Sequence, residues 1–148
     1  MGIRTWKLRA AWAAFVAAGL AAAAGPVAAR VTICETEAKK SPRDFLPARF
    51  SWDDSTRVAK LTDRFTPGEF PGTATRISKD GSRERVNLVF DVPEAKFGFS
   101  TLELLVAGPL NGETLWYVMG VGFKGKGAER VLDGFLQDGS PRATCLSQ

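Results

Sequence analysis

The side chains that most often carry enzyme chemistry are scarce in this sequence. It has no histidine and only two cysteines, Cys34 and Cys145. Nucleophilic catalysis of the Ser-His or Cys-His type is therefore excluded, and no Ser-x-x-Lys or Gly-x-Ser-x-Gly motif offers another activated nucleophile. Two thiols without histidine also fall short of the four ligands that structural zinc takes. The sequence accordingly predicts no catalytic residue, no metal site and no cofactor.

The adjacent carboxylates Asp53 and Asp54 are the remaining candidates for acid–base chemistry. Such chemistry needs two acids in different environments that converge on one substrate atom. Neighbouring residues of a strand point to opposite faces, and Asp54 directly precedes a segment with helical spacing. Capping a helix is therefore the expected role of Asp54. An enzyme that relies on carboxylates and lysines alone remains the third functional hypothesis.

The stretch Gly-Val-Gly-Phe-Lys-Gly at residues 120–125 has the spacing of a dinucleotide-binding motif. That motif needs a strand before it and a helix after it, so that phosphate meets the helix N-terminus. Here Gly120 and Gly122 lie within an apolar, strand-like run, and each following lysine precedes a glycine rather than the Ser or Thr of a P-loop. We interpret these glycines as positions where a strand avoids crowding or forms a bulge.

The two cysteines predict a structural disulfide. Cys34 and Cys145 lie near the two ends of the domain, and no Cys-x-x-Cys spacing indicates a redox-active pair. An isolated pair in an oxidising compartment usually forms a disulfide, and closing a loop of about 100 residues stabilises a fold by roughly 4–5 kcal/mol in the chain-entropy model. The bond would place the first and last segments of the domain side by side.

The first 29 residues have the pattern of a secretory signal peptide. Arg4, Lys7 and Arg9 precede a run of small apolar residues over 10–24, and Val-Ala-Ala at 27–29 suits signal peptidase. The apolar run is shorter than the ~20 residues of a spanning helix, so a stable membrane span is not expected. The sequence predicts a signal peptide over 1–29, a single domain over 30–148, and export to the periplasm or beyond the cell.

Export also changes the charge of the protein. Removing residues 1–29 takes away three of the 20 Lys and Arg residues and none of the 16 Asp and Glu residues, so the formal net charge falls from +4 to +1. A charge this small gives no reason to expect a nucleic-acid partner.

Residues 30–148 favour a mainly β fold, an antiparallel meander that forms a small barrel or sandwich with one short helix. Turn signals, including the Asp-Gly pairs at 80–81 and 138–139, separate runs of alternating apolar residues. The helix is expected over 54–65, where Val58, Leu61 and Phe65 recur at helical spacing, and a strand over 57–62 is the alternative. The expected strands cover 31–35, 49–52, 73–78, 83–92, 97–107 and 114–123, and a last hairpin joins 129–136 to 142–146.

The hairpin over 97–107 and 114–123 is apolar on both faces. Leu104 and Leu105 point to opposite faces of one strand, and Trp116 and Tyr117 do the same on the other. Strands of this kind are usually covered on both sides, and the favoured cover is the expected helix with a second sheet layer. Trp52, Trp116 and Tyr117 are accordingly expected in the core. The alternative is that one face lines a cavity or meets another protein.

Three functions are compatible with this pattern. The first is a non-enzymatic exported module that binds another exported or envelope protein and acts, for example, as an inhibitor, an immunity-type protein or an envelope accessory protein. Glycine-rich loops on a rigid sheet suit such contacts, and they give four candidate contact residues: Asn111, Glu113, Lys124 and Lys126. The second is a carrier of an apolar small molecule such as a lipid. The third is the carboxylate and lysine enzyme.

Overall fold

Alternating apolar residues and frequent turn residues give a chain that is built mostly of antiparallel strands. The computed structural model of the protein describes residues 29–36, 48–110, 114–125, 127–135 and 142–148. A helical turn, α1 (Glu94–Phe97), lies between β5 and β6, and a 3-10 turn, η1 (Gly127–Glu129), precedes β8. The strands within this part of the chain are β1 (Val31–Thr36), β2 (Arg49–Asp53), β3 (Val58–Thr62), β4 (Glu69–Asp80), β5 (Arg83–Asp91), β6 (Thr101–Gly108), β7 (Leu115–Lys124), β8 (Val131–Phe135) and β9 (Arg142–Ser147).

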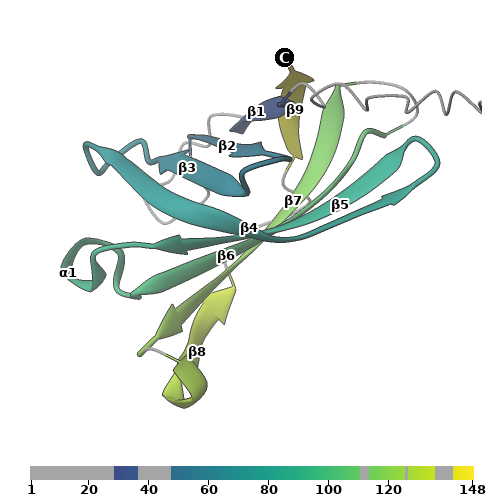
Figure 1. Cartoon of the computed structure of the whole chain (residues 1–148). Coiled ribbons are helices and arrows are strands. Elements are labelled where there is room, and N and C mark those ends of the chain that lie inside the picture. The colour runs from purple at the N-terminus through teal and green to yellow at the C-terminus, as the bar shows by residue number, and fades with distance from the viewer. Residues whose placement is uncertain (1–28, 37–47, 111–113, 126, 136–141) are drawn as a thin grey trace, which may run out of the picture.

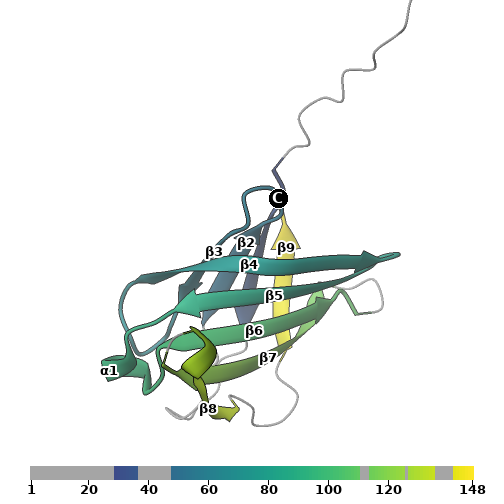
Figure 2. The same ribbon diagram turned by 60° about the horizontal axis from the view of Figure 1, so that its bottom comes forward.

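The strands β1 to β7 and β9 close into an eight-stranded antiparallel barrel (Figure 1). Each strand from β1 to β7 pairs with the next along the chain, and β9 lies between β7 and β1. β8 stands outside the ring and pairs with the far end of β7, at residues 121–124. In Figure 2, β4, β5, β6 and β7 run side by side as the near wall, with β2 and β9 behind them.

The interior of the barrel is filled by side chains from alternate residues of each strand, as the twofold period of a strand requires. Trp52 and Trp116 meet edge to face inside it, with ring centroids 5.8 Å apart. Both tryptophans are buried, which confirms the prediction that they belong to the core. Nine further side chains of the interior are almost completely buried: Phe50, Leu61, Val86, Leu88, Phe90, Leu102, Leu104, Val106 and Val118.

The helix predicted over 54–65 is wrong. Residues Val58–Thr62 form strand β3, in which Ala59 and Leu61 are buried while Val58 is exposed. β3 pairs with β2 on one side and β4 on the other, and these ladders satisfy the backbone of a segment too short to be a stable helix alone. The one α-helical turn of the described chain is α1, which follows Pro93 and ends at Gly98 in the left-handed conformation (φ 79°).

The predicted hairpin between the last two strands is also wrong, although both strands exist. β8 and β9 each pair with β7 rather than with each other, at residues 121–124 and 115–117 respectively. The remaining strand predictions are confirmed, with β4 beginning at Glu69 rather than Thr73 and β6 at Thr101 rather than Phe97. The sequence marks where strands lie, whereas barrel closure decides which strands pair.

Candidate functional site

The predicted disulfide joins Cys34 of β1 to Cys145 of β9 across a sequence separation of 111 residues. The two residues are direct register partners, with their Cα atoms 4.1 Å apart, and both side chains are buried in the barrel. The first and last segments of the described domain therefore lie side by side, as the sequence predicts. The bond belongs to the core, where it holds the seam between the two ends of the chain.

The four predicted contact residues are placed only in part. Lys124 is the last residue of β7 and is exposed. Asn111, Glu113 and Lys126 lie outside the described residues.

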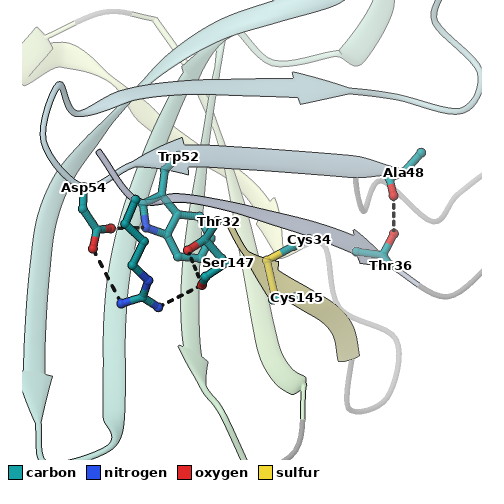
Figure 3. Close-up of a disulfide and its surroundings, with 9 residues drawn as sticks. Thr32, Cys34, Thr36, Ala48, Trp52, Asp54, Cys145 and Ser147 are labelled. Atoms are coloured by element: carbon teal, nitrogen blue, oxygen red, sulfur yellow. Dashed lines mark hydrogen bonds and ion pairs between the residues drawn. A yellow bond between two sulfur atoms is a disulfide. The ribbon is translucent and has the colours of Figure 1, made fainter. Parts of the chain in front are cut away.

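A network of charged and polar side chains lies at one end of the barrel. The guanidinium of Arg30 donates to Oε2 of Glu84 at 3.2 Å and to Oγ of Ser147 at 3.0 Å, and it lies 3.7 Å from Oδ2 of Asp54. Nζ of Lys79 lies 3.1 Å from the same Asp54 oxygen. Figure 3 shows Asp54, Trp52, Thr32 and Ser147 converging beside the disulfide.

This network is best explained as a structural one, which closes the end of the barrel through hydrogen bonds and ion pairs. Trp52 Nε1 donates to Asp54 Oδ1 at 3.0 Å, and the hydroxyls of Thr32 and Ser147 are 3.0 Å apart. Glu84 is 4% exposed, and its Oε1 has no hydrogen-bond partner in the described part of the chain. Its other oxygen is held by Arg30, so the carboxylate is paired inside the barrel wall.

The two adjacent aspartates have separate roles, and neither caps a helix. Asp53 closes the turn before β3, because its Oδ1 accepts hydrogen bonds from the Ser55 hydroxyl (2.6 Å) and from the backbone N–H groups of Ser55 (2.7 Å) and Thr56 (3.0 Å). The Ser55 hydroxyl, followed by these N–H groups, lowers the pKa of Asp53 below the ordinary value of an aspartate. Asp54 points instead into the network at the barrel end. The prediction of a helix cap at Asp54 is therefore wrong.

The glycine-rich stretch over 120–125 does not have the strand–turn–helix context that a phosphate-binding motif needs. Gly120 and Gly122 are inside β7, and no α-helix follows Gly125 in the described chain before β8. A Cβ atom at Gly122 would come within 2.7 Å of the Phe99 ring, so glycine is needed there for packing. This confirms the interpretation that a glycine of β7 avoids crowding.

The described residues lack two further features, a cluster of potential metal ligands and a helix able to cross a bilayer. No group of three or more His, Cys, Asp or Glu side chains comes together there in a way that could hold a metal ion. No helix in the same residues has the length and hydropathy needed to cross a bilayer.

The outer wall of the barrel carries an apolar patch on β6 and β7. Leu105 is the register partner of Met119, and Ala107 is the partner of Tyr117. Leu105 is 39%, Tyr117 45% and Met119 37% exposed. We call these four residues the outer patch. The prediction that a helix covers this second apolar face is wrong, because the predicted helix is a barrel strand, and Tyr117 lies outside the core for the same reason.

Four arginines flank the outer patch. In register across the wall, Arg85 of β5, Ala107 of β6, Tyr117 of β7 and Arg142 of β9 form one row. In the next row, Arg76 pairs with Asn87 and Asn87 with Leu105. Arg83 continues the outward positions of β5 toward its turn. We call Arg76, Arg83, Arg85 and Arg142 the arginine rim.

The arginine rim is exposed and has free hydrogen-bonding capacity. All four side chains are exposed, and none makes an ion pair or a side-chain hydrogen bond within the part of the chain that the structure describes. Asp80 is the one acidic residue among the outward positions of the β4–β5 tip, where it faces Arg83 in register. Arg76, Arg83 and Arg85 are close together in the sequence. Arg142 is distant from them in the sequence, and barrel closure brings it into one row with Arg85.

Known proteins give no further guide to this site. No protein-family model matches the sequence, and neither a curated protein nor a solved structure is significantly similar to it.

Proposed function

We propose that this protein is an exported, non-enzymatic module that binds another exported protein through the outer patch. Export rests on the signal-peptide pattern of residues 1–29, and the disulfide is compatible with an oxidising compartment. The observation that carries the proposal is the exposure of Leu105, Tyr117 and Met119 together on one wall. Contiguous apolar side chains on a soluble surface are typical of a contact site, and Tyr, Met and Arg are enriched in such sites.

The rest of the structure supports contact with a protein more than transport of a ligand. A carrier of an apolar molecule needs an internal cavity, whereas here buried aromatic and aliphatic side chains pack together in the barrel interior. A hollow of about 270 Å³ is bordered by residues of β1 to β4, and its lining combines apolar side chains such as Val31 and Ile33 with the charged Arg49, Lys60 and Glu69. Charged side chains in this lining do not suit a fully apolar ligand, so the carrier hypothesis remains the second candidate.

The proposal is tested by comparing capture of a partner by matched variants. The tagged, exported chain is purified from its own cell envelope, and co-purifying proteins are quantified by mass spectrometry. The patch variant carries Leu105→Ser, Tyr117→Ser and Met119→Ser. The control carries Val58→Ser and Leu146→Ser, which remove exposed apolar side chains from β3 and β9.

We expect one protein to co-purify at near-equal stoichiometry with the wild type and with the control, and to be lost by at least tenfold from the patch variant. Loss of two or three well-packed apolar contacts is sufficient for a change of this size. Equal capture by the patch variant and the wild type, or no stoichiometric protein with either, would refute the proposal. Thermal unfolding of each variant verifies that the barrel remains folded.

A further inference from the structure

We infer that the partner presents an acidic, helical segment to the outer patch and that the arginine rim binds its carboxylates. This inference rests on the proposed function and specifies the partner's chemistry. Its first support is charge. Arg76, Arg83, Arg85 and Arg142 surround the patch, and none has an ion-pair partner in the described chain. Glu103 also lies on the outer face of β6. It is already paired with Arg130, so it does not neutralise the arginine rim.

The second support is the type of cation. The cationic side chains that flank the outer patch are all arginines. The β4–β5 hairpin also contains a lysine, Lys79, but this side chain faces the barrel end and pairs with Asp54. A guanidinium forms two parallel hydrogen bonds with one carboxylate, whereas an ammonium acts as a point charge. Tyrosine and methionine next to exposed arginines match the composition of protein contact sites. These features favour a carboxylate-bearing protein over an anionic lipid surface, which lysine would serve equally well.

The third support is the geometry of the wall. At the Arg85 row, β5, β6 and β7 are paired on both edges, so a partner cannot add a strand there and must bind through side chains. Arg85 and Arg142 lie three strand intervals apart, or about 15 Å at ~4.8 Å per interval. Three turns of an α-helix, about 11 residues, cover nearly the same length. A helix with acidic residues three turns apart and apolar residues between them therefore matches the row.

The test uses three synthetic helical peptides of that design. The first has two glutamates separated by 11 positions, with leucines between them at spacings of three and four residues. The second replaces both glutamates with glutamine, and the third replaces them with lysine. Binding to the exported chain, produced from its full coding sequence, is measured by fluorescence anisotropy at low and at high salt.

Matched protein variants separate the contribution of the arginine charges to binding from that of the apolar outer patch. One carries Arg85→Gln and Arg142→Gln, and the control carries Arg49→Gln and Arg57→Gln, which remove the same net charge from the region of β2 and β3. We expect the glutamate peptide to bind about tenfold more tightly than the glutamine peptide and to lose that advantage in the first variant and at high salt, but not in the control. The lysine peptide should bind most weakly.

The outcomes distinguish this inference from the proposed function. If the serine variant of the outer patch loses the native partner while Arg85→Gln with Arg142→Gln retains it, and the glutamate and glutamine peptides bind alike, the acidic inference is wrong and the proposed function stands. If neither variant affects capture, both are wrong. Vesicles of phosphatidylglycerol are the third probe. Binding to these vesicles that depends on the arginine rim, without preference for the glutamate peptide, would assign the surface to lipid and overturn the inference.

Discussion

The two faces of the β6–β7 hairpin carry similar apolar side chains, but one face is buried and the other is exposed. Leu104 points into the barrel and is 1% exposed, whereas its neighbour Leu105 lies on the outer wall. Trp116 and Tyr117 show the same contrast on β7. Both faces are apolar by sequence, yet one closes the core and the other remains open to solvent. Hydrophobicity therefore identifies what can be buried, while the neighbours supplied by the fold determine what is buried.

The largest expected effect comes from exchanging one leucine on each face. Leu104→Ala leaves a cavity in a packed interior and should lower the free energy of unfolding by about 2–5 kcal/mol. Leu105→Ala removes the same atoms from the outer wall and should change it by only about 0.5 kcal/mol. Urea unfolding monitored by tryptophan fluorescence measures both. Equal losses would show that the outer patch contributes to the core, which would contradict the contrast between the faces.

A smaller effect is expected from adding a methyl group on the inner face of β7. A Cβ atom at Gly122 would lie 2.7 Å from the Phe99 ring, so Gly122→Ala should cost about 1–3 kcal/mol through overpacking. Val121→Ala, on the outer side of the same strand, should cost less than about 1 kcal/mol. Thermal unfolding of the two variants compares them. A tolerated alanine at 122 would mean that the inner face has room to rearrange.

The smallest effect should come from Asp53, the last residue of β2, whose carboxylate closes the turn before β3. Its pKa is lowered in the folded state by the Ser55 hydroxyl and by backbone N–H groups. Its stabilising contribution is therefore present above the ordinary aspartate pKa of about 3.9 and is lost as the pH falls through the lower folded value. Asp53→Ala should reduce stability at pH 7, and this loss should become smaller as the pH falls below the ordinary aspartate pKa.

Ser55→Ala is the matched control for this pH dependence, because it keeps the carboxylate and removes the largest cause of its lowered pKa. It should give a smaller version of the same profile in denaturant titrations between pH 2 and pH 7. A loss of stability in Asp53→Ala that is independent of pH would assign the effect to the shape of the turn rather than to the charge.

Much of the fold was predictable because its signals are local. The Asp-Gly turn between β4 and β5, the alternation of Val86, Leu88 and Phe90, and the pairing of the two cysteines all follow from adjacent residues or from elimination. The segment around Val58 and Leu61 was predicted wrongly because a five-residue run satisfies helical and strand spacing equally. Its strand conformation depends on β2 and β4, which lie outside the segment.

The candidate site was predictable only in its parts. The sequence shows that the β6–β7 hairpin is apolar on both faces and that the β4–β5 tip is basic. It does not show which face points outward, since strand alternation assigns residues to two faces without saying which one meets the core. It also does not show that Arg142 lies in one row with Arg85, because that row depends on register across four strands.

The sequence by itself determined the strand-rich composition, the absence of histidine chemistry, the disulfide partners and the pattern expected of a signal peptide. These properties depend on residue type and local spacing, which a linear chain displays directly. Only the tertiary structure decided that the barrel closes through β6–β7 and β1–β9, that Tyr117 faces outward, and that arginines from three strands surround one apolar patch. The physical reason is that closure gives every barrel strand a neighbour on each side, and it thereby brings together residues that no local interaction connects.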